Sequence, residues 1–253
     1  MIEATNTQSS IATRGEPHGG ASLKGAVKKF IPRRLLRWLT NNRAVVWMRA
    51  TAKGWALRKR SHDEVYGADY FKMVDETTGK SAKIMARSLV DQLRPWTAVD
   101  LGCGTGNLMA ELNALGVATR GVEYAEAALA YCRERGLHVE KADFTADGAF
   151  DSTVGEFDLA ISTEVVIQLA PDVARNYIEY LCRHSDTVLF SSPPCARDRL
   201  PKSPQTSEYW IGVFEENGFE LDRELSRDLQ KRWQEEGTAP WFHRDPMIFR
   251  RSA

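Results

Sequence analysis

Short apolar runs alternate along the chain with longer segments whose apolar residues recur at helical spacing. The run over 96–101 is followed by Leu108, Leu112 and Leu115, which lie on one face of a helix. The alternation continues with expected strands at 117–122, 157–162 and 186–191, each followed by an expected helix, at 125–135, 172–183 and 206–216. Repeated strand-helix units of this length predict an α/β fold, with a parallel sheet covered by helices on both faces.

Further elements flank these units. A helix over 81–93 leads into the first strand, a third apolar run ends at Ala142-Asp143-Phe144, and a charged helix runs through Trp233. The segment Met247–Arg250 follows Pro246 and is expected to be the last strand.

Three glycines spaced two apart, Gly102, Gly104 and Gly106, follow the first strand directly. Glycine lets the backbone turn sharply and approach a ligand closely, and the amides at the start of the next helix favour an anionic group. The segment Thr97–Asn107 is therefore predicted to be a nucleotide-cofactor loop.

Two classes of cofactor are compatible with such a loop. A dinucleotide-binding fingerprint requires glycine at position 107, where this chain has Asn107. Glu123, at the end of the next strand, supplies the carboxylate that a ribose with free hydroxyls needs in either class. An NAD(P)-dependent oxidoreductase therefore remains an alternative, and so does a non-catalytic scaffold that binds a cofactor.

The motif Val-Asp-Leu-Gly-Cys-Gly-Thr-Gly over 99–106, together with Glu123, Asp143 and the strand over 158–164, resembles the class I S-adenosylmethionine-dependent methyltransferases. The resemblance covers about residues 66–251. It implies a doubly wound, Rossmann-like sheet of seven strands, mostly parallel with an antiparallel last strand. It also implies S-adenosylmethionine as the cofactor and S-adenosylhomocysteine as the product.

The resemblance further implies a role for each matching residue. Asp100 and the glycine loop would hold the methionine end, Glu123 the ribose, and Asp143 with Phe144 the adenine. The residues expected to bind the cofactor are Tyr70, Asp100, Gly102, Cys103, Gly104, Gly106, Asn107, Glu123, Tyr124, Asp143, Phe144, Ser162 and Thr163. For Tyr70 and its neighbour Phe71, covering the cofactor and plain packing on the sheet stay open as alternatives.

Methyl transfer from a sulfonium is an in-line displacement, and a hydroxyl acceptor also needs a base. The segment Glu164–Leu169 resembles a Glu-Val-x-Glu-His-Leu pattern of small-molecule members, but Ile167 and Gln168 replace its second Glu and its His. Glu164 is therefore one candidate catalytic residue. His243, in an aromatic segment before the last strand, is the other.

The segment Pro204–Trp210 resembles one found in bacterial methyltransferases of sugars and secondary metabolites. We expect a small-molecule hydroxyl or amine as acceptor, such as a sugar, a glycan or a natural product. The residues expected to contact it are Gln168, Tyr209, Trp210 and Trp241. A nucleic-acid base is not expected as the acceptor, because Cys195 stands where an aromatic residue would have to stack on a flipped base.

Charge is distributed unevenly along the chain. Residues 24–60 carry twelve Lys or Arg and no acid, whereas residues 61–253 carry 21 basic and 32 acidic side chains. We predict a disordered tail over 1–22, a basic amphipathic helical extension over 23–65, and the methyltransferase domain over 66–253. The extension could contact an anionic membrane or an anionic substrate, or pack its Trp side on the domain.

Four cysteines, Cys103, Cys132, Cys182 and Cys195, show neither Cys-x-x-Cys pairing nor metal-ligand spacing. We therefore expect reduced thiols and no metal. No apolar run approaches the roughly 20 residues of a membrane span. The expected location is the cytoplasm, with peripheral membrane contact through residues 24–60 left open.

Overall fold

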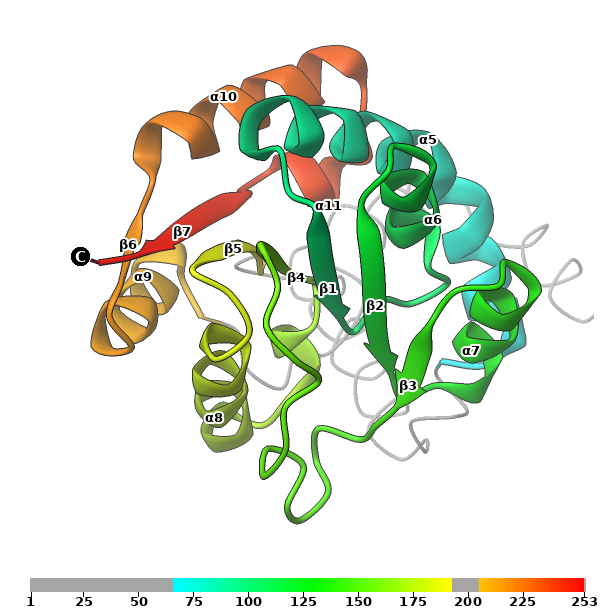
Figure 1. Cartoon of the computed structure of the whole chain (residues 1–253), viewed down its shortest axis with the longest axis horizontal. Helices are drawn as coiled ribbons and strands as arrows, with labels where there is room; N and C mark the ends of the chain where they lie inside the picture. The colour runs from blue at the N-terminus through cyan, green and yellow to red at the C-terminus, as the bar shows by residue number, and fades with distance from the viewer. Residues whose placement is uncertain (1–65, 193–204, 253) are drawn as a thin grey trace, which may run out of the picture. The chain divides into compact units, whose positions relative to one another are not determined.

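A single seven-stranded sheet forms the centre of the computed structural model, which describes residues 66–192 and 205–252 (Figure 1). The strands are β1 (Thr97–Leu101), β2 (Ala118–Glu123), β3 (Val139–Lys141), β4 (Leu159–Thr163), β5 (Thr187–Ser191), β6 (Phe219–Leu221) and β7 (Met247–Arg251). Their order in the sheet is β3-β2-β1-β4-β5-β7-β6. The predicted tail and basic extension, over 1–22 and 23–65, lie outside the described residues.

The first five strands are parallel, and β7 runs antiparallel to both of its neighbours. β1 lies at the centre, where Asp100 pairs with Gly121 of β2 and Ile161 of β4. The predicted mostly parallel sheet with an antiparallel last strand is thus confirmed. Although β7 comes last in the chain, it is not an edge strand, because it lies between β5 and β6.

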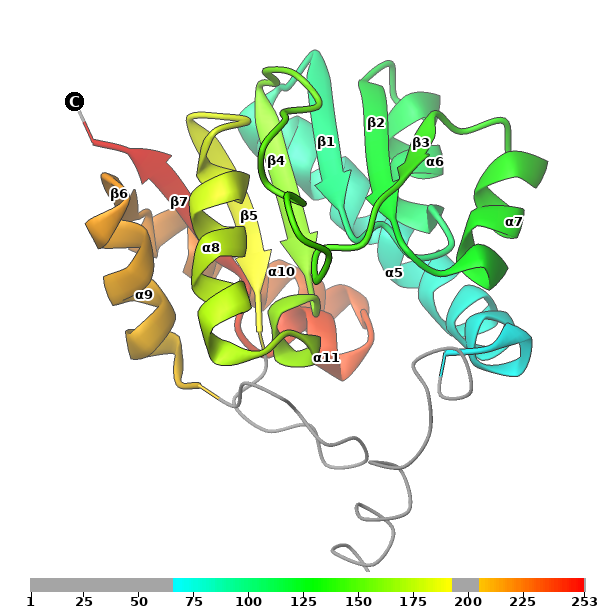
Figure 2. The same cartoon turned by 90° about the horizontal axis from the view of Figure 1, so that it is seen from below.

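Helices cover both faces of the sheet (Figure 2). They are α5 (Ala68–Leu93), α6 (Asn107–Ala114), α7 (Glu126–Glu134), the 3-10 turn η1 (Val166–Gln168), α8 (Pro171–Cys182), α9 (Ser207–Glu216), α10 (Arg223–Glu236) and α11 (Pro240–His243). Because side chains alternate between the two faces of the sheet, the core has two parts, one on each face. Val99 and Phe190 pack with α8 and α9, whereas Ala98 and Leu189 pack with α5 and α10.

One helix differs from the sequence prediction. The aromatic segment around Tyr70 and the expected helix over 81–93 belong to one continuous helix of 26 residues, α5. The polar stretch between them carries Gly79 and no apolar repeat, so local propensity does not indicate a helix there. Contacts with α6 and α7 stabilise it, as described below.

The carboxyl ends of β1, β4 and β5 meet at one edge of the sheet, where η1 and α11 also lie (Figure 2). In doubly wound sheets this edge is where ligands bind. Within the described residues, no helix is both long and apolar enough to cross a membrane.

Candidate functional site

The three glycines after β1 all adopt left-handed backbone conformations, with φ of 85° at Gly102, 56° at Gly104 and 75° at Gly106. A Cβ atom added to Gly102 would lie 2.4 Å from a methyl carbon of Val165, and one added to Gly106 would lie 2.4 Å from Leu137 Cδ1. A Cβ atom at Gly104 would meet no atom of residues 66–192 and 205–252 within 4 Å. The outer glycines are therefore required by packing, whereas Gly104 has open space beside it.

Glu123, the last residue of β2, is buried and its carboxylate organises this loop. Oε2 accepts a hydrogen bond from the Gly104 amide at 2.9 Å, and Oε1 accepts from the amides of Tyr124 and Ala125 at 2.8 Å each. A carboxylate has about four acceptor positions. Glu123 can therefore hold the loop and still accept from hydroxyl groups of a ligand.

Asp100, near the end of β1, is a buried carboxyl group with an unsatisfied atom. Its Oδ1 has no hydrogen-bond partner among the described residues. Burial, and secondarily the charge of Glu123, raises the pKa of Asp100 from 3.8 to about 7. Because a buried carboxyl group without a partner is costly, it marks a position where a ligand donor or cation would be stabilised.

Glu164 follows β4 at the same edge, with a φ of 65° that is unusual for a residue other than glycine. Its Oε1 accepts a hydrogen bond from Ser191 Oγ at 3.2 Å. Burial raises the pKa of Glu164 to about 7, against the opposing effects of Ser191 and of the Arg244 charge. Backbone strain and a pKa near neutrality both occur preferentially at functional sites.

Two sequence matches bear on the family. Residues 87–195 match the family model of the methionine biosynthesis protein MetW. A ubiquinone biosynthesis O-methyltransferase of Methylococcus capsulatus is 35% identical over 101 residues, which are 38% of this chain and 42% of that protein. The chain thus spans less than half the length of this curated relative.

Solved structures match over a larger part of the chain. A TehB-like S-adenosylmethionine-dependent methyltransferase from Corynebacterium glutamicum has a TM-score of 0.53 at 17% identity, over 76% of this chain and 98% of that one. CalS10, an amino pentose methyltransferase from Micromonospora echinaspora, has a TM-score of 0.50 at 15% identity, over 82% of this chain and 97% of that one. This chain has the class I S-adenosylmethionine-dependent methyltransferase fold. The resemblance inferred from the glycine motif is confirmed at this level, and the CalS10 structure holds S-adenosylmethionine.

In this methyltransferase fold, three residues expected at the cofactor make contacts with protein groups. The Asn107 amide donates to Asp75 O at 3.2 Å and to Thr78 Oγ1 at 2.9 Å, both on α5. Asp143 Oδ1 accepts from the amide of Thr145 at 2.8 Å. Phe144 is buried and packs edge-to-face on Tyr177, with ring centroids 4.8 Å apart.

Other residues expected at the cofactor lie around the loop. Tyr70 packs between Tyr66 and Phe71 in a small cluster with the start of α7. The Cys103 sulfur lies 3.9 Å from Gly104 O, to which the Cys132 thiol donates at 3.3 Å. The interaction with Cys132, together with burial, raises the pKa of Cys103 well above its usual value. Ser162 is fully buried, and Thr163 beside it is half-buried.

The residues expected at the acceptor are distributed over η1, α9 and α11. Trp210 is fully buried in the core, so only Tyr209 of this pair is partly accessible. Gln168 is half-buried, and Trp241 is 39% exposed. His243 ends α11, where its Nδ1 lies 3.1 Å from Thr238 Oγ1.

Four residues that the sequence prediction did not include belong to this edge. Ser191 binds Glu164, Ser192 has a buried hydroxyl without a partner among the described residues, and Arg244 acts on Glu164 through its charge. The Tyr177 hydroxyl donates to Leu101 O at 2.9 Å and lies 2.8 Å from Ser162 Oγ, which links the ends of β1 and β4 to α8. The two serines could have been predicted from the sequence, because they stand at the end of an expected strand. Arg244 and Tyr177 have no such signal in the sequence.

Proposed function

We propose that this chain transfers a methyl group from S-adenosylmethionine to an oxygen or nitrogen atom of a small-molecule acceptor. The observation that carries the proposal is the edge formed by β1, β2 and β4. This edge carries the left-handed glycine loop and the carboxylate of Glu123 that binds it. It also carries Glu164, whose φ is positive, and the buried Asp100, whose Oδ1 has no hydrogen-bond partner among the described residues.

The residues of the loop fit this cofactor. The Asp100 Oδ1 atom suits the ammonium group of the methionine end, since a cation there would satisfy the buried carboxyl group. The open space beside Gly104 admits a close ligand, and Glu123 retains acceptor capacity for the ribose hydroxyls. When bound, S-adenosylmethionine supplies a methyl group on a positively charged sulfur.

Glu164 is the favoured base for a hydroxyl acceptor. A carboxylate with a pKa near 7 can accept a proton at neutral pH and is a stronger base than an ordinary glutamate. Ser191 orients Oε1 by donating to it. An amine acceptor needs no such base, because its lone pair becomes free when its ammonium form loses a proton. In that case Glu164 would serve to align the acceptor.

The proposed acceptor class rests on the small molecules named for the relatives. One relative is named for ubiquinone biosynthesis, and CalS10 is described as acting on an amino pentose. The partly exposed rings of Tyr209 and Trp241 could bind a sugar or an aromatic acceptor through its apolar face. A sugar, glycan or natural-product acceptor is therefore proposed.

The test is calorimetric titration of the full chain with S-adenosylhomocysteine and, separately, with NAD. We expect binding of the first and none of the second. Glu123→Ala should weaken binding by about 1 to 3 kcal/mol, because it removes a charged hydrogen-bond acceptor. Glu140→Ala is the control, since Glu140 is an exposed residue on β3.

Three results would count against the proposal. Equal affinity of the Glu123→Ala variant and the unaltered chain would remove the ribose assignment. Binding of NAD instead would favour the oxidoreductase alternative. Binding of S-adenosylhomocysteine without turnover of any sugar, glycan or quinone-type acceptor would favour a cofactor-binding scaffold.

A further inference from the structure

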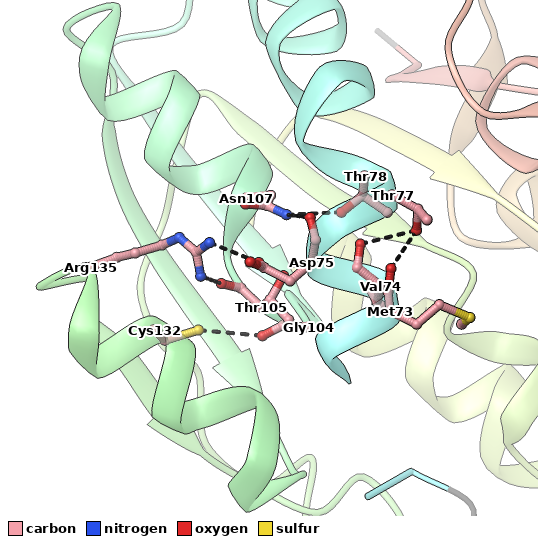
Figure 3. A network of polar contacts seen from close by, with 10 residues as sticks. All are labelled: Met73, Val74, Asp75, Thr77, Thr78, Gly104, Thr105, Asn107, Cys132 and Arg135. Carbon is pink, nitrogen blue, oxygen red and sulfur yellow. Dashed lines mark hydrogen bonds and ion pairs between the residues drawn. The ribbon is translucent and has the colours of Figure 1, made fainter. Parts of the chain in front are cut away.

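A group of polar contacts fastens the middle of the glycine loop to helices α5 and α7 (Figure 3). Arg135, the residue that follows α7, donates through one guanidinium nitrogen to Thr105 O at 3.0 Å. Its other terminal nitrogen donates to Asp75 Oδ1 of α5 at 2.7 Å. A single side chain therefore bridges the loop to a helix that lies sixty residues earlier in the chain.

The same turn of α5 is bound a second time by the first residue of α6. The Asn107 amide donates to the backbone carbonyl of Asp75 and to the hydroxyl of Thr78. Asp75 is thus bound by Arg135 at its carboxylate and by Asn107 at its carbonyl, and Figure 3 shows both contacts meeting at this residue.

The Arg135 and Asp75 side chains are 27% and 20% exposed, whereas those of the nearby pair Arg133 and Glu126 are 61% and 60% exposed. Reduced solvent screening strengthens the first pair relative to the second. The Arg135 guanidinium also lies 5.6 Å from the centre of the Tyr131 ring, which further restricts its position.

The bridged carbonyl lies within the proposed cofactor cradle. Thr105 separates Gly104, whose amide is held by Glu123, from Gly106, whose backbone is left-handed. The loop is therefore held at adjacent residues by Glu123 and by Arg135. α5 also begins beside this region, where Phe71 packs with Ala125 and Ala128.

We propose that Arg135 is a positioning residue for the cofactor, which acts by holding Thr105 and Asp75 in one arrangement. This role requires arginine, because its planar guanidinium group donates to Thr105 and to Asp75 at the same time. A lysine ammonium group reproduces this geometry poorly. The inference rests on the proposed function, because it assumes that the loop holds S-adenosylmethionine or its product.

The experiment compares Arg135→Ala with Arg133→Ala in the full chain, by calorimetric titration with S-adenosylhomocysteine. Arg133 is the matched control, because it lies two residues earlier, in α7, and pairs with the carboxylate of Glu126 rather than with the loop. We expect affinity about tenfold weaker in Arg135→Ala and unchanged in Arg133→Ala. Arg135→Lys should be intermediate.

Asp75→Asn tests the other half of the bridge, since it retains the backbone contact to Asn107 and loses only the charge. It should also weaken binding, because it weakens the contact from Arg135. Combining it with Arg135→Ala should add little, because that contact is already lost in Arg135→Ala. Hydrogen exchange at the amides of 102–106 should accelerate in Arg135→Ala and stay unchanged in β4 and β5, a difference that general destabilisation would not produce.

The outcomes separate the two proposals. If the unaltered chain does not bind S-adenosylhomocysteine, the proposed function fails. If it binds and Arg135→Ala binds equally well, the positioning role is wrong. Should Arg135→Ala fail to fold, Asp75→Asn and Arg135→Lys decide in its place, and unweakened binding in both would overturn the role.

Discussion

Two carboxyl groups, those of the buried Asp100 and the half-buried Glu164, distinguish the proposed site at the scale of single residues. Burial raises the pKa of each to about 7, so both can change charge in the neutral range. Their environments differ, because Asp100 has an oxygen with no hydrogen-bond partner in the described part of the chain, whereas Glu164 accepts a hydrogen bond from Ser191. We infer that Asp100 binds a cationic group of the ligand and that Glu164 exchanges a proton.

The pKa of Asp100 predicts how stability changes with pH. Because the pKa of Asp100 rises from 3.8 to about 7 on folding, the folded chain binds the proton more tightly than the unfolded chain. This contribution is fully present below pH 3.8 and is lost as pH rises through 7. Asp100→Asn should therefore lose less stability than the unaltered chain between pH 5 and pH 8, as measured by urea unfolding.

The same residue links cofactor binding to proton release. A ligand ammonium beside Asp100 would lower its pKa again, so binding of S-adenosylhomocysteine at about pH 6 should release a proton. Calorimetry in buffers of different ionisation enthalpy measures this release, which Asp100→Asn should abolish. Equal release in both proteins would contradict the assignment of Asp100 to the ammonium group.

The base can be identified by two substitutions once an acceptor is known. Glu164→Gln should lower turnover roughly 10²-fold for a hydroxyl acceptor and remove the rise in rate near pH 7, because the amide cannot accept the proton. Cofactor binding should be retained. His243→Ala should have a smaller effect, with His138→Ala as the control, and the opposite ranking would make His243 the base.

At the scale of elements, the loop between β1 and α6 contains glycines that have similar backbone conformations but different surroundings. Gly106 has a positive φ and is crowded by Leu137 and Cys132, whereas Gly104 has a positive φ and no crowding from the described residues. The same substitution at the two positions should therefore have different costs.

Gly106→Ala should destabilise the chain by about 2 to 4 kcal/mol, because strain adds to overlap with Leu137. Gly104→Ala should cost about 1 kcal/mol from backbone strain alone. Chemical denaturation without cofactor measures both values. Equal costs at the two positions would show that the neighbours of Gly106 move aside freely.

Most elements could be predicted because their signals are local. The strands β1, β4, β5 and β7 and the helices α7, α8 and α9 lie within one or two residues of the predicted bounds. The first half of α5 could not be predicted as part of that helix, since its polar residues are stabilised by α6 and α7. The bond from Asn107 to Thr78 is an example of such support.

At the scale of the whole molecule, charge is distributed unevenly along the chain. The twelve basic residues over 24–60 lie outside the described residues, and the rest of the chain from residue 61 carries 32 acidic side chains against 21 basic ones. Association with an anionic partner stays a prediction.

The prediction for this segment is that the full chain sediments with vesicles containing anionic phosphatidylserine, and that salt weakens the association. Replacing Arg33, Arg34 and Arg37 by glutamine should reduce the bound fraction, since each cation contributes about 1 kcal/mol near such a surface. Neutral phosphatidylcholine vesicles are the control. Equal binding to both lipids would exclude an electrostatic membrane contact.

The sequence by itself determined the alternation of strands and helices, the glycine loop and the carboxylates at the strand ends. These features depend on residue spacing and on the conformational freedom of glycine, which are properties of neighbouring residues. Only the tertiary structure decided that Phe144 and Trp210 are buried, that Asn107 faces α5, and that Arg135 meets Asp75. Those outcomes depend on contacts between residues far apart in the chain, which form only when the helices pack against the sheet.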